Sequence, residues 1–478
     1  MTEPIFPSLT HPDGREAIRI GDAAVSYEQL AGAGAATAQE LQGASRVAVW
    51  AEPTLELAIA VVGALATGVA VVPINPGLGP RELGHIVDDS APERFVAWPG
   101  VDPPPRLEHL PRTDIDRAAA GGDLPDELAD DDVAFVMYTS GTTGPPKGVQ
   151  IPRRAVTSNL DALAEVWQWT AEDRLAHALP VFHVHGLVIG ILGPLRRGGH
   201  VEHAGRFSPQ ALANALTRGA TMMFGVPTMY SRIARDAADD PDLASAYAKA
   251  RLLVSGSAAL PTTVHEAMRR LTGQEILERY GLTETLMNAG VRIGEDVVPG
   301  RVGPPLPGVE LKLIADDGAT IETSDDETIG EIAVRGPNVF KGYLNRPDAT
   351  DEAMRGGWFM TGDLATRDAS GSLKLVGRKS TDLIKSGGYR IGAGEIEGAL
   401  LDHPAVAEVA VTGRPDEDLG ERIVAWVVPE PGKNPSADEL TDYVATVLTK
   451  HKRPREVHFL EELPRNAMGK VVKHELEA

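Results

Sequence analysis

The chain has 478 residues, a formal net charge of −22 and no cysteine, and 42% of its residues are hydrophobic and 24% charged. This length predicts about three folding units of ordinary globular composition. The negative charge argues against nucleic-acid binding and membrane docking, because both partners are anionic. The lack of cysteine excludes disulfides, cysteine-ligated zinc and thiol catalysis, and it fits a reducing compartment. We see no basic region followed by an apolar core at the N-terminus, so we expect no signal peptide and a cytoplasmic location.

Short apolar runs alternate with helical stretches through most of the chain. Strands are predicted at Arg46–Trp50, Val69–Val72, Val133–Met137 and Leu252–Ser255. Alternation of this kind predicts an α/β architecture with largely parallel sheets.

The apolar stretch from Leu57 to Ile74 is nearly long enough to span a bilayer. Three breaking residues interrupt it: Gly63, Gly68 and Pro73. We therefore favour a helix opened by Pro53 and closed by Gly68, followed by a buried strand.

Two later segments depart from this pattern. Pro99 to Asp132 is rich in proline and glycine and is expected to be a surface loop with short helices. From Leu383 the chain restarts a compact β/α pattern. We predict an N-terminal domain over residues 1–378, a hinge at 379–381 and a small C-terminal α+β domain over 382–478. Earlier, Glu331–Arg335 has an alternating pattern, and a turn-rich stretch leads to Trp358. In the C-terminal domain, strands are expected at Val406–Val411 and Ile423–Val428, and a helix at Ala437–Leu448.

A loop dense in hydroxyl groups follows the strand at Val133–Met137. Residues 138–149 read Tyr-Thr-Ser-Gly-Thr-Thr-Gly-Pro-Pro-Lys-Gly-Val. A glycine-rich loop that leaves a strand can direct backbone N–H groups at a polyphosphate, with a lysine as counter-charge. The Walker A pattern requires Ser or Thr after the lysine, whereas Gly148 follows Lys147 here. A polar surface turn is the alternative interpretation.

Four further short motifs carry chemistry that suits a nucleotide. A tyrosine offers a stacking face for a base, and a carboxylate is a hard ligand for Mg²⁺ or an acceptor for two ribose hydroxyls. An arginine supplies several donors in a fixed geometry. In chain order, the motifs are Tyr-Gly-Leu-Thr-Glu at 280–284, Thr-Gly-Asp at 361–363 with Gly-Arg at 377–378, Ser-Gly-Gly-Tyr-Arg-Ile-Gly-Ala-Gly-Glu-Ile-Glu at 386–397, and Pro-Arg-Asn-Ala-Met-Gly-Lys at 464–470.

In this order, the motifs resemble those of the adenylate-forming superfamily of acyl-CoA synthetases, aryl-CoA ligases, adenylation domains and luciferases. The resemblance extends from residue 138 to residue 470 and implies ATP, Mg²⁺ and coenzyme A as cofactors or co-substrates. It implies Lys470, Lys147, Thr283 and Glu284 as catalytic residues, with Glu284 as the Mg²⁺ ligand. The nucleotide contacts that it implies are Thr139, Ser140, Gly141, Thr142, Thr143, Gly144, Lys147, Ser257, Glu278, Tyr280, Thr283, Asp363, Arg378 and Lys470.

The resemblance also implies that the C-terminal domain is mobile. It rotates between the two half-reactions, so that Lys470 leaves and the loop Ser386, Gly387, Gly388 and Tyr389 enters the thioester-forming channel. A lysine acetyltransferase acting on Lys470 would remove its charge. The stretch from Gly377-Arg378 to Asp382 is one residue longer than the family pattern, which leaves the hinge residue open.

Arg279 carries the prediction of substrate class. It precedes Tyr280, where many relatives have a small residue beside the acyl pocket. A guanidinium there disfavours apolar tails and favours a second carboxylate, which it can bind with two hydrogen bonds. Together with Ser257 and the Gly-Arg-Lys-Ser-Thr-Asp stretch, it resembles the malonyl-CoA and methylmalonyl-CoA synthetases. A surface arginine paired with a neighbouring acid is the alternative.

Three further residues are expected near the acyl group. The resemblance implies Val184 and Met287 as apolar walls and His183 as part of the gate between nucleotide and acyl pocket. A metal site formed by His183 and His185 is an alternative, although no third ligand follows at suitable spacing. We thus predict an ATP-dependent ligase for malonate or methylmalonate. The alternatives are a short-chain or aryl acyl-CoA synthetase, and an adenylating protein that loads a carrier or only senses the nucleotide.

Overall fold

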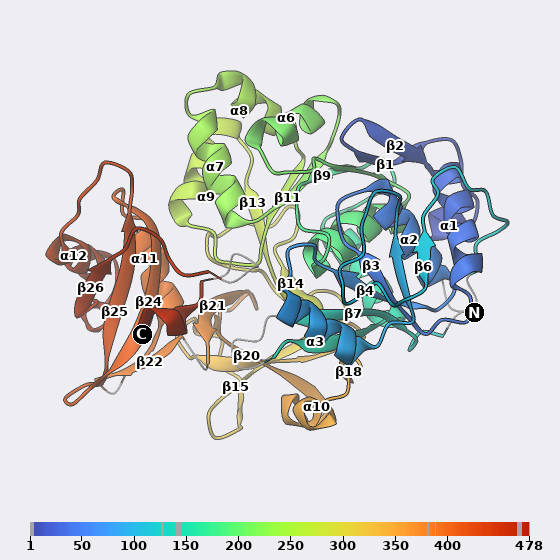
Figure 1. Ribbon diagram of the computed structural model, residues 1–478. Helices are drawn as coiled ribbons and strands as arrows, with labels where there is room; N and C mark the ends of the chain where they lie inside the picture. Colours follow the sequence, from blue (N-terminus) through green and yellow to red (C-terminus); the bar gives the residue numbers. More distant parts are fainter. Residues whose placement is uncertain are drawn as a thin grey trace.

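The computed structural model describes residues 4–125, 129–139, 145–379, 382–387, 389–465 and 471–477. Within these residues the strands form four sheets. Helices pack on two large, mostly parallel sheets, a third antiparallel sheet lies beneath them, and the residues from 382 onward form a separate sheet with its own helices (Figure 1). The predicted α/β class with a C-terminal α+β unit is confirmed.

The first large sheet has seven strands in the order β18-β8-β7-β4-β3-β5-β6. Apolar residues alternate between its two faces: Val47 and Val49 face the main core, whereas Ala48 faces a smaller cluster beside helix α3. Burial on both faces explains the continuous apolar runs that marked these strands. The elements are β3 (Arg46–Trp50), β4 (Ala70–Ile74), β5 (Arg94–Ala97), β6 (Arg112–Asp114), β7 (Val133–Thr139), β8 (Lys147–Pro152), β18 (Gly342–Tyr343), α1 (Tyr27–Leu41), α2 (Leu55–Ala66), α3 (Pro80–Ser90) and α4 (Arg153–Val166).

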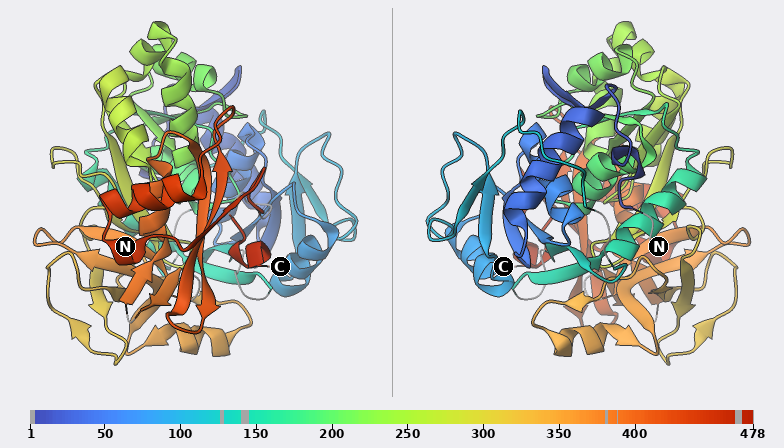
Figure 2. Two further views of the ribbon diagram at one scale, coloured as in Figure 1. Left: turned by 90° about the vertical axis from the view of Figure 1, so that its left-hand side faces the viewer. Right: turned by 90° about the vertical axis from the view of Figure 1, so that its right-hand side faces the viewer.

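The second large sheet has eight strands in the order β14-β13-β12-β11-β9-β10-β1-β2. Helices α6 to α9 cover one face and stand at the top of both views in Figure 2. The elements are β1 (Glu16–Ile20), β2 (Ala23–Ser26), β9 (Arg174–His177), β10 (His200–His203), β11 (Met222–Gly225), β12 (Leu252–Ser255), β13 (Ile276–Leu282), β14 (Leu286–Gly290), α5 (Gly193–Arg197), α6 (Pro209–Thr217), α7 (Pro227–Ala237), α8 (Pro241–Tyr247) and α9 (Thr262–Thr272).

The remaining two sheets are largely antiparallel. The third contains β15 (Glu310–Ile314), β16 (Thr320–Ile321), β17 (Gly330–Arg335), β19 (Met354–Arg355), β20 (Trp358–Arg367) and β21 (Leu373–Arg378), with α10 (Pro347–Ala353) nearby. The C-terminal sheet contains β22 (Leu383–Ser386), β23 (Tyr389–Gly392), β24 (Val406–Asp416), β25 (Gly420–Pro429) and β26 (Glu456–Phe459), and it packs with α11 (Ala393–Leu401) and α12 (Ala437–Val447).

The strand predictions agree with the structure, but one loop prediction is wrong. The apolar stretch divides as expected into α2 and β4, and none of the described helices is long and apolar enough to cross a bilayer. The segment Pro99–Asp132 was expected to hold short helices. Its described part instead contains turns and the edge strand β6. Three consecutive prolines from Pro103 lack the N–H groups that a helix needs, which accounts for the difference.

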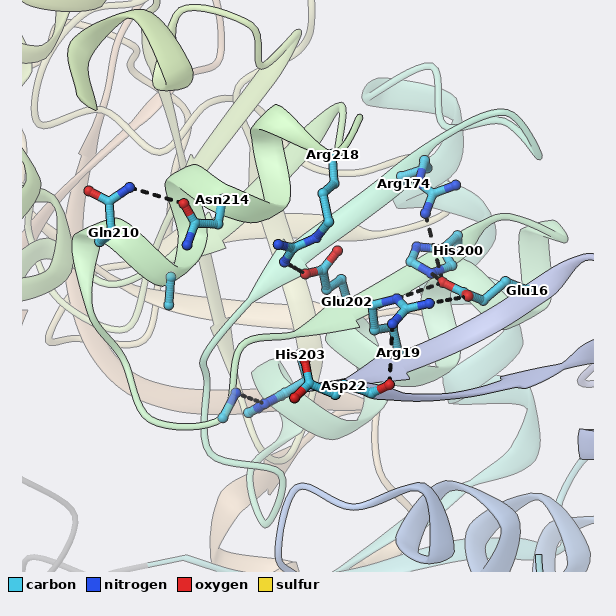
Figure 3. Close-up of polar contacts among 12 residues, drawn as sticks. Glu16, Arg19, Asp22, Arg174, His200, Glu202, His203, Gln210, Asn214 and Arg218 are labelled. Carbon is cyan, nitrogen blue, oxygen red and sulfur yellow. Dashed lines mark hydrogen bonds and ion pairs between the residues drawn. The ribbon is translucent and has the colours of Figure 1, made fainter. Parts of the chain in front are cut away.

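A cluster of charged side chains links the paired strands β1 and β10 within the second large sheet (Figure 3). Glu16 of β1 accepts hydrogen bonds from Arg19 and from His200 of β10, the latter at 2.8 Å. Burial raises the pKa of Glu16, but these hydrogen bonds outweigh it and lower the pKa overall. The cluster lies on strands far from the nucleotide motifs, so it belongs to the scaffold.

Candidate active site

Two buried side chains, Tyr280 and Asp363, meet the half-exposed side chain of Arg378 in a polar cluster between two sheets. Tyr280 near the end of β13 donates a hydrogen bond to Asp363 Oδ2 at 2.6 Å. Arg378 Nε lies 2.8 Å from Asp363 Oδ1, and the two residues are direct partners in the β20–β21 ladder. Burial raises the pKa of Asp363 although Arg378 and Tyr280 oppose it, and burial raises that of Tyr280 well above its ordinary value. Each carboxylate oxygen retains a lone pair for a further donor such as a hydroxyl.

A second cluster joins Glu284 and Lys147 through Tyr343, which the sequence analysis did not single out. The Tyr343 hydroxyl donates to Glu284 Oε1 at 2.8 Å, and Lys147 Nζ lies 4.5 Å from the centre of the Tyr343 ring. Strand β18 brings Tyr343 here because it pairs with β8 directly after Lys147. Thr283 lies in the turn that connects Tyr280 to Glu284. The two clusters therefore share one turn of the chain.

The ends of the phosphate loop form a tight antiparallel pair. Thr139, the last residue of β7, is the partner of Lys147, the first residue of β8. A Cβ on Gly148 would lie 3.0 Å from the Tyr138 ring, so the position after the lysine favours glycine over the Ser or Thr of a Walker A loop. The predicted loop residues Ser140, Gly141, Thr142, Thr143 and Gly144 lie outside the described residues.

Arg279 is buried, with 5% of its surface exposed, so the surface alternative is wrong. Its Nε and Nη2 atoms have no hydrogen-bond partner among the described residues. The guanidinium lies against Gly256, where a Cβ would approach Cζ to 2.4 Å. Burial alone lowers the pKa of Arg279 to about 10. A buried cation with unused donors is costly unless an anion joins it.

Two residues beside Arg279 are polar and constrained. Glu278 accepts backbone hydrogen bonds from Gly300 at 2.8 Å and Leu260 at 3.3 Å, and burial raises its pKa to about 7. Ser257 follows Gly256 and has a φ of 76°, a left-handed conformation that is uncommon outside glycine. The structure thus places both predicted residues around the Arg279 strand, with Glu278 held by backbone contacts.

His185, which the sequence analysis considered only as a metal ligand, begins a π-helical turn at His185–Leu192. Both of its ring nitrogens lack a partner among the described residues. Burial lowers its pKa well below the ordinary value, and the charge of Arg279 lowers it further. His183 contacts the Phe182 ring instead, with centroids 4.5 Å apart. Val184 and Met287 are buried apolar residues, as expected of pocket walls or core.

The C-terminal motif residues lie on a surface hairpin. Ser386 ends β22, and Gly387 donates its N–H to the Leu419 carbonyl at 2.9 Å. Tyr389 is 54% exposed and stacks on His451 with ring centroids 4.0 Å apart. His451 lies in a basic run, Lys-His-Lys-Arg at 450–453, that the sequence analysis did not use. Gly388, Lys470 and two residues of the predicted hinge, Ser380 and Thr381, lie outside the described residues.

The described residues fit Mg²⁺ better than a multi-ligand metal. They contain no group of three or more His, Asp or Glu side chains arranged for a metal ion, so His183 and His185 gain no third ligand. Mg²⁺ commonly uses only one or two carboxylates and completes its shell with phosphate and water. Glu284, with Lys147 nearby, can supply that kind of site.

Comparisons with known proteins identify the family. Residues 8–344 match the AMP-binding enzyme family and residues 395–470 match its C-terminal domain. The chain is 34% identical to a malonate–CoA ligase of Arabidopsis thaliana, over 91% of this chain and 78% of the relative. Its structure is similar to a malonyl-CoA ligase complex with methylmalonyl-CoA and AMP, at 56% identity and a TM-score of 0.76, covering 96% and 100% of the two chains. It is also similar to ATP-bound MatB from Rhodopseudomonas palustris, at 32% identity and a TM-score of 0.89, covering 100% and 98%. The chain therefore belongs to the AMP-binding enzyme family.

Proposed function

We propose that this protein is an AMP-forming acid–thiol ligase that activates malonate or methylmalonate with ATP and transfers the acyl group to coenzyme A. One observation supports the choice of acid: the buried guanidinium of Arg279, one residue before Tyr280, has donors that find no partner in the part of the chain that the structure describes. A monocarboxylic tail would leave that charge unpaired, whereas a second carboxylate would neutralise it. The relatives named as malonate–CoA ligases and the malonyl-CoA ligase complex support the same choice.

The nucleotide is proposed to bind across the two polar clusters. Tyr280 and Asp363 are joined by a 2.6 Å hydrogen bond, so the ring can lie beside the base while the carboxylate accepts from the ribose hydroxyls. Arg378 holds that carboxylate and adds positive charge. Lys147, Thr283 and the loop at 139–144 would contact the phosphates. Bound at Glu284, Mg²⁺ would neutralise phosphate charge.

In the first half-reaction, a carboxylate oxygen of the acid forms a bond to the α-phosphorus of ATP. The bond from that phosphorus to the β-phosphate oxygen breaks, and pyrophosphate leaves. The substrate supplies the nucleophile, so the protein needs only to orient the reactants and offset charge. We assign the charge role to Lys147 and Lys470 and the orienting role to Arg279, Ser257 and His183, with Val184 and Met287 as walls.

In the second half-reaction, the CoA sulfur forms a bond to the activated carbonyl carbon, the bond from that carbon to the AMP oxygen breaks, and the thiol proton is released. The exposed Tyr389–His451 stack beside basic residues suits an adenine nucleotide. We place the hinge at 379–381 between domains 1–378 and 382–478. The higher TM-score with the ATP-bound relative than with the more identical product complex supports two domain orientations.

Two half-reaction assays test the proposal. Pyrophosphate release is measured with acetate, butyrate, benzoate, malonate, methylmalonate and succinate, and AMP release is then measured with and without CoA. Malonate or methylmalonate should give the highest kcat/KM, and AMP release should require CoA. A preference for butyrate or benzoate would favour the alternative acyl-CoA synthetase. Pyrophosphate release without CoA-dependent AMP release would favour a carrier-loading or sensing protein.

Lys470→Ala tests the assignment of the adenylation lysine. The variant should lose acyl-AMP formation while largely retaining thioester formation from supplied acyl-AMP, and acetylation of the same amine by a lysine acetyltransferase should act alike. Equal loss in both half-reactions would contradict the role.

We also propose a cytoplasmic location, which the lack of cysteine supports.

A further inference from the structure

One helix holds both ends of the phosphate loop. His85 Nε2 of α3 donates a hydrogen bond to the Pro146 carbonyl at 2.7 Å, just before Lys147. One helical turn later, Asp89 Oδ2 accepts a hydrogen bond from the Tyr138 hydroxyl at 2.7 Å, just before Thr139. Positions four residues apart lie on the same face of a helix. A single face of α3 therefore contacts the chain directly before and directly after the loop.

A third segment of the chain also contacts Asp89. Asn345, two residues after Tyr343, donates from Nδ2 to the Asp89 backbone carbonyl at 2.8 Å and to its Oδ1 at 3.2 Å. The Leu344 N–H donates to the Gly148 carbonyl at 2.7 Å. Asp89 thus accepts hydrogen bonds from Tyr138 and Asn345, which lie on either side of strand β8. The His85 and Tyr138 rings also meet edge to face, with centroids 6.2 Å apart.

These polar contacts are separate from the contacts that dock the helix. Leu83, Ile86 and Val87 lie on another face of α3 and are buried in the apolar cluster against the seven-stranded sheet. Burial of three aliphatic side chains is the main driving force for docking α3. His85 and Asp89 are therefore available for a task other than attaching the helix.

We propose that His85 and Asp89 are positioning residues for ATP activation, which fix the separation of the two loop ends and so place Lys147 against the phosphates. This inference rests on the proposed function, because it takes Lys147 as a phosphate contact. Misplacement of a contact group by about 1 Å can lower a rate by about a hundredfold, so a clamp on both loop ends has a direct kinetic consequence.

The test compares variants of one helix in two half-reactions. Asp89→Ala and His85→Ala should each lower kcat/KM for ATP in pyrophosphate release by about tenfold or more, because each loses a hydrogen bond that sets the loop ends. Thioester formation from supplied malonyl-AMP should stay within about twofold of wild type, because that step uses no β- or γ-phosphate. His85→Gln should restore most of the activity, since its amide can donate to Pro146.

Asp88→Asn is the matched control. Asp88 is the neighbouring carboxylate on α3, exposed and 3.5 Å from Arg106, and its loss should change neither half-reaction. Tyr138→Phe removes the Asp89 contact from the other side and remains informative if Asp89→Ala folds poorly. In the double variant Asp89→Ala/Tyr138→Phe, kcat/KM for ATP should be close to that of the single variants, because both substitutions remove the same hydrogen bond.

Three outcomes overturn the inference: equal losses in both half-reactions, wild-type kinetics for Asp89→Ala and Tyr138→Phe, or full additivity in the double variant. Lys147→Ala separates this inference from the proposed function. If Lys147→Ala abolishes adenylation while the His85 and Asp89 variants behave like Asp88→Asn, only the positioning role of His85 and Asp89 is wrong. If Lys147→Ala adenylates normally, the assignment of the phosphate contact is wrong.

Discussion

At the scale of single residues, Arg279 shows what the sequence could and could not predict. Its position before Tyr280 indicated a charged acyl pocket, and its burial at 5% exposure agrees with that. The unpaired donors could not be predicted, because they depend on which side chains from other strands fail to reach the guanidinium. The sequence analysis weighed His185 only as a metal ligand, because its neighbour Arg279 is distant in the chain.

Arg279→Ala should raise the KM for malonate by one to two decades. Loss of a hydrogen-bonded charged contact costs about 1.5–3 kcal/mol, which corresponds to that range. The emptied pocket should accept butyrate better than before. The measurement is kcat/KM for malonate and butyrate in both proteins. If the ratio of kcat/KM for malonate to kcat/KM for butyrate does not change, Arg279 does not bind the distal carboxylate.

Glu278→Gln should change how stability depends on pH. Burial raises the pKa of Glu278 from 4.5 to about 7, so the folded protein binds the proton more tightly than the unfolded chain. The resulting stabilisation is complete below the unfolded value and is lost as pH rises through about 7, by roughly 3 kcal/mol at most. Glutamine cannot titrate, so the variant should lack this decline.

Urea denaturation midpoints of both proteins, measured from about pH 5 to about pH 8, provide the comparison. The buried histidines add an opposite trend in both proteins, which cancels in the difference between them. Parallel curves would mean that Glu278 does not titrate in this window.

At the scale of elements, the predicted strands carry the site, whereas two unpredicted elements arrange it. Tyr280, Asp363 and Arg378 come from three separate motifs and meet in the structure, because Asp363 and Arg378 pair across β20 and β21 and Tyr280 of the other sheet reaches Asp363. The local sequence gives no indication of the roles of the two-residue strand β18 and of the polar face of α3. Their roles arise only when β18 pairs with β8 and when α3 lies beside the phosphate loop.

Tyr343→Phe and Tyr343→Leu should separate the two contacts of this tyrosine. Phenylalanine keeps the ring beside Lys147 but loses the hydroxyl bond to Glu284, worth about 0.5–1.5 kcal/mol, so about two- to tenfold more Mg²⁺ should be needed for half-maximal adenylation. Leucine also loses the cation–π contact, so the KM for ATP should rise further. Pyrophosphate release is titrated with Mg²⁺ and then with ATP. An unchanged Mg²⁺ requirement in the phenylalanine variant would argue against the Glu284 contact.

At the scale of the whole molecule, the chain end is fastened back to the start of the C-terminal domain. Lys473 Nζ lies 2.6 Å from Asp382 Oδ1 and 2.7 Å from Glu397 Oε1. Asp382 in turn accepts the backbone N–H of Arg378 at 2.9 Å. The segment that follows the predicted catalytic lysine is thus tied to the residue that follows the predicted hinge.

Lys473→Met should destabilise the C-terminal domain. Burial raises the pKa of Glu397 while Lys473 opposes this, so removal of the lysine leaves two neighbouring carboxylates without their cation. The pair is partly exposed, and we expect a loss of about 1–3 kcal/mol. Calorimetry should show that this domain unfolds at a lower temperature in the variant than in the wild type. Lys433→Met, which changes an exposed lysine of the same domain, is the control and should melt like wild type; equal melting of the two variants would contradict the role.

Arg279, whose Nε and Nη2 atoms have no partner among the described residues, also predicts how small acids affect thermal unfolding. An acid that neutralises this buried charge binds the folded chain and not the unfolded one, and it must raise the melting temperature by mass action. An acid without a second carboxylate cannot offer that compensation. Thermal-shift screening of small acids, with no ATP, no CoA and no turnover, can therefore identify the cognate substrate from the unfolding transition alone.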